Sequence, residues 1–78
     1  MQLKDIRLLF EHGALKEAII SPVFDDWSIE FTRKELAENI TIETQKGQQR
    51  VFKTLNAAYA AIREVGFRNA RIIDERSS

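Results

Sequence analysis

The chain begins with an apolar stripe at three- and four-residue spacing, which predicts an amphipathic helix over residues 2–12. Gly13 is expected to end this helix, because glycine takes the left-handed conformation after a helix without strain. His12 lies in the last turn, where exposed carbonyl groups favour a cation, so a structural role is favoured over that of a general base. The stripe consists of Leu3, Ile6, Leu9 and Phe10.

The next two segments have the composition of half-buried β-strands. Residues 16–23 form the first, and Pro22, which has no N–H group, places this strand at a sheet edge or ends it. Residues 25–26, both aspartate, supply turn chemistry. Residues 27–32 then alternate strictly between apolar and polar side chains. The side chains expected to face the helices are Trp27, Ile29 and Phe31.

Two more strands are expected after a charged connection. Residues 33–39 form either a helical turn or a long hairpin connection, because they hold few apolar side chains. Residues 40–44 alternate again, and a turn containing Gly47 leads into residues 49–53. In this last segment neighbouring apolar residues, Val51 and Phe52, should face opposite sides of the sheet.

The strongest local signals belong to a second helix and the strand after it. Thr54 is expected to cap the helix, and Gly66 followed by Phe67 is expected to end it. Residues 70–73 form a closing strand, which we expect to pair in parallel with residues 49–53 through a right-handed crossover. The apolar stripe of the helix comprises Leu55, Ala58, Tyr59, Ile62 and Val65.

These elements predict a single α+β domain over residues 1–78, with a frayed tail at residues 75–78. The expected order is α-β-β-β-β-α-β, a mostly antiparallel sheet with two helices on one face. Phe52 and Ile62 should be buried between the second helix and that sheet. The strand that holds Pro22 should lie at an edge that is too apolar to be exposed, with Ile19, Ile20, Val23 and Phe24 along it. We therefore expect the first helix or a second copy of the chain, in a homodimer, to cover this edge.

Composition excludes several classes of protein. The 78 residues include no cysteine, so neither a disulfide framework nor a thiolate metal site can form. Apolar runs are short, which predicts no membrane contact and a cytoplasmic location.

Charge is zero overall but uneven along the chain. Residues 22–44 carry a net charge of −4 and residues 45–78 a net charge of +4. The basic part could form a nucleic-acid-binding surface, although pairing within the molecule is favoured. The candidate binding surface consists of Lys46, Arg50, Lys53, Arg68 and Arg71.

Catalytic patterns are scarce in the sequence. His12 is the single histidine, and no nucleophile lies in a recognisable motif with it. The three glycines are too far apart for a phosphate-binding loop, and neighbouring carboxylates at residues 25–26 would point to opposite faces of a strand. We therefore expect no catalytic residue, no metal site and no cofactor.

Two resemblances bear on function. The helix–strands–helix order is similar in topology to double-stranded RNA-binding domains, but the second helix lacks their basic start. More of the chain takes part in a second resemblance, through Leu3–Leu9, Gly13–Leu15 and Glu43–Ala58, which includes the run Arg50-Val51-Phe52-Lys53-Thr54-Leu55-Asn56-Ala57-Ala58. These segments resemble a family of small accessory proteins encoded beside plasmid partition genes (ParC-like proteins). That resemblance implies that the chain is encoded on mobile DNA and acts in a bacterial cytoplasm. The function that it implies is that of a non-enzymatic module, which acts through a partner protein in the maintenance of a plasmid or integrated element. A nucleic-acid-binding module is the alternative, with weak nucleic-acid contact expected at most.

Overall fold

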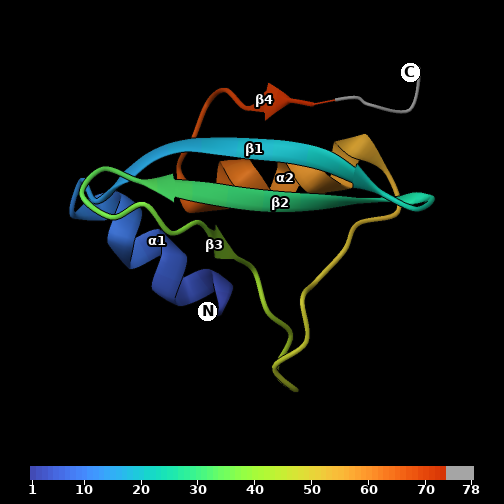
Figure 1. Ribbon diagram of the computed structural model, residues 1–78, viewed down its shortest axis with the longest axis horizontal. Coiled ribbons are helices and arrows are strands. Elements are labelled where there is room, and N and C mark those ends of the chain that lie inside the picture. The colour runs from blue at the N-terminus through green and yellow to red at the C-terminus, as the bar shows by residue number, and fades with distance from the viewer. Residues whose placement is uncertain (74–78) are drawn as a thin grey trace.

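The computed structural model describes residues 1–73 and shows two helices and a four-stranded mixed sheet (Figure 1). The expected α+β class is confirmed, and the order of elements is close to the expected one. The frayed tail expected at residues 75–78 lies outside the described residues. The elements are α1 (Leu3–Glu11), β1 (Leu15–Val23), β2 (Asp26–Arg33), β3 (Ile40–Thr41), α2 (Leu55–Val65) and β4 (Arg71–Ile72).

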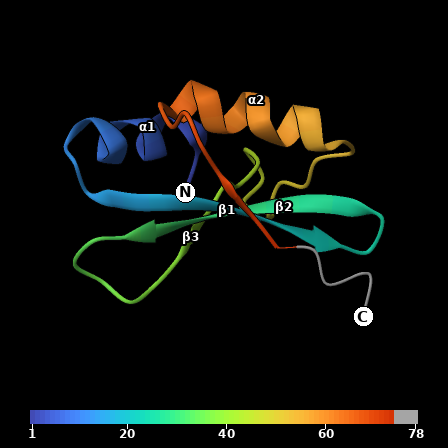
Figure 2. The same ribbon diagram turned by 90° about the horizontal axis from the view of Figure 1, so that it is seen from above.

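Both helices lie on the same side of the sheet (Figure 2), so the domain has one helical layer and one sheet layer. The core between them is apolar throughout, as a two-layer architecture requires. Phe31 and Ile62 lie at its centre with 0% and 1% of their surfaces exposed. The other largest fully buried side chains are Ile6, Ile20, Ile29 and Ile42.

The long β1–β2 hairpin is the centre of the sheet. Its antiparallel register pairs Ala18 with Phe31 and Ile20 with Ile29, which places these apolar side chains on the helical face. The register shifts between Leu15 and Glu17, so a bulge allows Leu15 to stay in the core as well. The predicted inward side of residues 27–32 is thus confirmed at Ile29 and Phe31.

The expected partner of the closing strand is wrong. β4 pairs in parallel with β1, through Ile19–Arg71 and Ile20–Ile72, and the sheet order is β3-β2-β1-β4. Residues 49–53 do not form a strand: only Gln49 and Phe52 make single bridges, to Glu43 and Trp27.

Two local contacts explain why residues 49–53 leave the sheet. The Arg50 N–H donates to the Ile42 carbonyl oxygen at 2.8 Å, which turns this part of the chain back on residues 42–44. Two residues later, Phe52 enters the core beside Trp27 with 5% of its surface exposed. Val51 between them is exposed, so the predicted opposite orientation of Val51 and Phe52 is confirmed without a continuous strand.

The expected edge position of the strand with Pro22 also needs correction. β1 is an inner strand, and β4 rather than α1 lies along it. Association with a second copy of the chain stays a prediction. β4 pairs with β1 only at Ile19 and Ile20, and the Ile73 N–H donates to the Ile20 carbonyl oxygen at 2.8 Å. Backbone N–H groups two residues apart in a strand point to the same side. Pro22 is two residues after Ile20, so the N–H that it lacks would point toward β4, at a position where β4 no longer pairs with β1. The proline therefore breaks no hydrogen bond with β2.

The helix ends follow the sequence closely. The Thr54 hydroxyl accepts a hydrogen bond from the Ala57 N–H at 3.1 Å and caps α2. Gly66 at its other end has φ 132°, and Gly13 after α1 has φ 73°. Phe67 packs edge-on against Phe10, with ring centroids 4.7 Å apart. Residues 34–39 contain no helix and form the hairpin connection between β2 and β3.

Candidate functional site

The β1–β2 hairpin closes with an unusual two-residue turn. Val23 pairs with Asp26, so Phe24 and Asp25 are the turn residues. Phe24 has φ 55°, and among the described residues 1–73 it is the one residue other than glycine with a positive φ. Its surface is 95% exposed. An aromatic residue thus occupies a left-handed position at the end of the hairpin, where its ring contributes almost no burial.

Both properties of Phe24 act against stability. A residue with a Cβ atom costs roughly 1–2 kcal/mol in the left-handed region. An exposed ring recovers little of the free energy that a buried phenylalanine contributes. Backbone outliers of this kind concentrate at binding and catalytic sites, and exposed aromatic residues are frequent anchors in protein interfaces. Phe24 is therefore the leading candidate for a functional residue.

Charge around the turn is mainly acidic. Asp25 is exposed beside Phe24, and Asp26 starts β2. The Lys53 Nζ atom lies 3.4 Å from Asp26 Oδ1, and the Trp27–Phe52 bridge attaches the segment that leads into α2 to this end of the hairpin. Lys53 is 85% exposed, and the pair adds little stability by itself. A partner that binds Phe24 would meet the carboxylate of Asp25 at the same place.

The five basic residues of the candidate binding surface lie in different parts of the molecule. Lys46 and Arg50 belong to the connection that follows β3, at one edge of the sheet, whereas Arg71 lies in β4 at the opposite edge. Lys53 pairs with Asp26 at the end of the hairpin. Arg68 shares a hollow with Arg71. The structure therefore brings Arg68 and Arg71 together, but separates them from the other three.

A hollow of about 530 Å³ lies between the start of α1 and residues 42–50. Lys4 and Arg7 line it from the helix, and Arg50 lines it from the opposite wall. Sequence analysis missed Lys4 and Arg7 because residues 1–21 carry three basic and three acidic side chains and have no net charge. Their spacing of three residues places both on one side of a helix, and this pattern could have predicted a shared basic surface.

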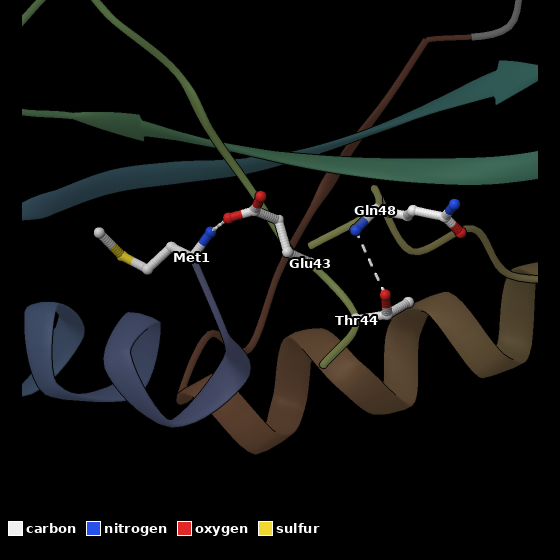
Figure 3. A network of polar contacts seen from close by, with 4 residues as sticks. All are labelled: Met1, Glu43, Thr44 and Gln48. Carbon is white, nitrogen blue, oxygen red and sulfur yellow. Dashed lines mark hydrogen bonds and ion pairs between the residues drawn. The ribbon is translucent and has the colours of Figure 1, made fainter. Parts of the chain in front are cut away.

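The wall of this hollow is fixed by polar contacts (Figure 3). The Met1 amino group forms an ion pair with the Glu43 carboxylate, and the Glu43 N–H donates to the Met1 carbonyl oxygen at 2.9 Å. The Thr44 hydroxyl accepts from the Gln48 N–H at 3.3 Å, and the Thr44 N–H donates to the Gln48 carbonyl oxygen at 2.7 Å. The Met1–Glu43 contacts attach the connection after β3 to the residues before α1, and the Thr44–Gln48 contacts close a turn within that connection.

A second basic hollow, of about 680 Å³, lies beside β4. Arg68 and Arg71 line it together with Lys16 of β1, which sequence analysis did not select. Glu17 lines the same hollow and lowers its net charge. The hollow is open to solvent and shallow, and its aromatic lining, Phe10 and Phe67, is part of the core contact between the helices.

The described residues hold no group of three or more His, Cys, Asp or Glu side chains placed to bind a metal ion. His12 is exposed at the C-cap of α1. Within residues 1–73, neither helix has the length and apolar character needed to cross a bilayer.

Comparisons of the chain with protein-family models, with curated proteins and with solved structures find no match. The functional assignment therefore depends on the chain's own residues and on their geometry.

Proposed function

We propose that this chain is a non-enzymatic accessory module that binds a partner protein through the β1–β2 turn. Phe24 supports this proposal most directly, because a 95% exposed phenylalanine at φ 55° is costly to the isolated domain. Burial of that ring in a partner's pocket would recover the free energy that the domain leaves unused. Aromatic anchors of this kind account for much of the binding energy in protein interfaces.

The acidic neighbours of Phe24 favour a protein over a membrane as the partner. Asp25 is exposed in the same turn, and a carboxylate there is repelled by anionic lipid headgroups. A protein pocket with a basic rim suits both residues. The resemblance to plasmid-partition accessory proteins supports the context, which we propose to be the maintenance of a plasmid or integrated element.

The proposal is tested by capture from a lysate of the organism that encodes the chain, with wild type and Phe24→Ser as baits. Leu36→Ser is the matched control, because Leu36 is 51% exposed in the connection at the far end of the hairpin (Figure 1). We expect a protein that wild type and Leu36→Ser retain, that Phe24→Ser loses, and that nuclease treatment leaves in place. Its purified form should bind Phe24→Ser at least about thirtyfold more weakly than wild type.

Two results would contradict this function. One is equal retention of every captured protein by the Phe24→Ser and wild-type baits. The other is loss of all capture after nuclease treatment, which would show that nucleic acid carries the contact.

A further inference from the structure

The hollow between α1 and residues 42–50 has the charge of an anion-binding site. Three cationic side chains line it, Lys4, Arg7 and Arg50. Among residues 1–73 none of the three forms an ion pair, since the ion pairs there are those of Glu43 and Asp26. Glu43 is the one carboxylate on the wall of the hollow, and the Met1 amino group neutralises it. The positive charge is therefore left for a ligand.

Arg50 is held in a fixed position on its side of the hollow. Its N–H donates to the Ile42 carbonyl oxygen at 2.8 Å, which sets the backbone. Its guanidinium carbon lies 4.9 Å from the centroid of the Phe52 ring, a cation–π contact with a side chain that is itself 5% exposed. Stacking on a ring uses the face of the guanidinium group and leaves its edge N–H donors available. Those donors match two oxygens of a phosphate or carboxylate.

Arg7 and Lys4 line the hollow from α1, and Arg50 lines it from the connection after β3. Lys4 and Arg7 are three residues apart on α1, so their side chains leave the same side of the helix. Thr44 also lines the hollow, and its hydroxyl, which accepts from the Gln48 N–H, still has an O–H group to donate. Donors thus converge from two elements that are distant in sequence.

The size of the hollow indicates the kind of ligand. Its volume of about 530 Å³ lies in the range of small-molecule sites, roughly 300–1,000 Å³, and it is open to solvent like the hollow beside β4. Apolar side chains, the half-buried Leu3 and the buried Ile42, form part of its lining. A nucleic-acid backbone would need further cations in line with these three. Instead Lys53 pairs with Asp26, and Arg71 lies at the other edge of the sheet.

We propose that this hollow binds the phosphate monoester of a small molecule. Arg7 and Arg50 contact the phosphate oxygens with their planar N–H groups, Lys4 adds a third charge, and the body of the ligand lies over the half-buried Leu3. This site is separate from the β1–β2 turn and does not depend on the proposed binding of a partner protein there.

The test is a titration followed by amide chemical shifts, at constant ionic strength, with inorganic phosphate and with phenyl phosphate as probes. We expect saturable shifts that are confined to the start of α1 and to residues 42–50. Dissociation constants should be on the order of 1–10 mM for phosphate and lower for phenyl phosphate, whose ring can cover the apolar lining. Lys4 and Arg7 are exposed on α1, so their replacement leaves the core intact.

Three variants separate a specific site from general charge. Lys4→Gln/Arg7→Gln should weaken phosphate binding at least about tenfold. Arg68→Gln/Arg71→Gln removes the same charge from the other basic hollow and should change the dissociation constant by less than about twofold. Arg50→Lys keeps the charge but loses the stacked, planar donor, and should weaken binding by about fivefold.

Several outcomes would overturn the proposal. These are the absence of saturable shifts, equal weakening in both double variants, and weaker binding of phenyl phosphate than of inorganic phosphate. A short DNA duplex that binds more tightly than phenyl phosphate, and that shifts amides at both basic hollows, would assign the charge to nucleic acid instead.

Discussion

The backbones of Trp27 and Phe52 exchange two hydrogen bonds, each 2.8 Å from nitrogen to oxygen. This single bridge attaches the segment before α2 to the outer side of β2, at the end of the hairpin that carries Phe24. The Phe52 side chain enters the core there, and the Arg50 guanidinium stacks on its ring. Phe52 thus connects the sheet, the start of α2 and the basic hollow.

Phe52→Ala should therefore cost about 3–5 kcal/mol in the free energy of unfolding, as expected for a buried phenylalanine. Val51→Ala is the matched control, because Val51 is 41% exposed in the same segment, and it should change stability by about 0.5 kcal/mol or less. Urea unfolding of both variants measures the difference. Equal effects of the two substitutions would show that the segment is placed incorrectly.

Gly66 is expected to tolerate no side chain. Its φ of 132° disfavours residues with a Cβ atom, and a Cβ atom there would lie 2.4 Å from the Phe10 ring. Gly66→Ala should lower stability by about 2 kcal/mol or more, since strain adds to displacement of the ring. Gly47 also has a positive φ, 85°, but a Cβ atom there would meet no neighbouring atom. Gly47→Ala should therefore lower stability only by the backbone strain, roughly 1–2 kcal/mol. A smaller effect at Gly66 than at Gly47, measured by thermal unfolding, would contradict the contact with Phe10.

The cap of α2 makes a smaller prediction. Thr54→Ala removes the acceptor for the Ala57 N–H and should cost about 0.5–2 kcal/mol. Thr54→Ser retains a hydroxyl and should recover most of that loss. If alanine and serine unfold at the same urea concentration, the hydroxyl does not cap the helix.

Local signals account for the parts of the fold that the sequence predicts well. Thr54 and Gly66 mark the ends of α2 through their own chemistry, and the strict alternation of residues 27–32 predicts β2. The partner of β4 could not be predicted in this way, because pairing with Ile19 and Ile20 depends on contacts far apart in the chain. Residues 49–53 were wrongly predicted to be a strand. The exposed Val51 beside the buried Phe52 gives the alternation that is typical of a strand, but here a single bridge to Trp27 produces the same alternation.

The same distinction applies to the candidate sites. Arg50 was predicted as a binding residue, but its association with Lys4 and Arg7 arises only when residues 42–50 fold against α1. Phe24 was expected as part of an apolar strand edge. The turn lies at Phe24 and Asp25 rather than at residues 25–26, a shift of one residue that moves the ring from the sheet to the solvent.

The alternative function, nucleic-acid binding, is tested by the affinity of the chain for DNA at low salt. The five predicted basic residues do not converge on one surface, so a DNA duplex at about 50 mM salt should bind no more tightly than the weak non-specific range, roughly 0.1 mM. Fluorescence anisotropy of a labelled duplex measures this. Submicromolar, salt-sensitive binding that a folded Arg50→Glu/Lys53→Glu variant loses would instead establish a nucleic-acid-binding module.

The central claim is that Phe24 serves a partner rather than the fold, and the unfolding free energy of Phe24→Gly tests it most directly. Glycine accepts φ 55° without strain, and a ring that is 95% exposed has little packing to lose. The account predicts that Phe24→Gly is as stable as wild type, or more stable by up to about 1 kcal/mol. A loss of more than about 1 kcal/mol would show that the ring stabilises the isolated domain and would contradict the account.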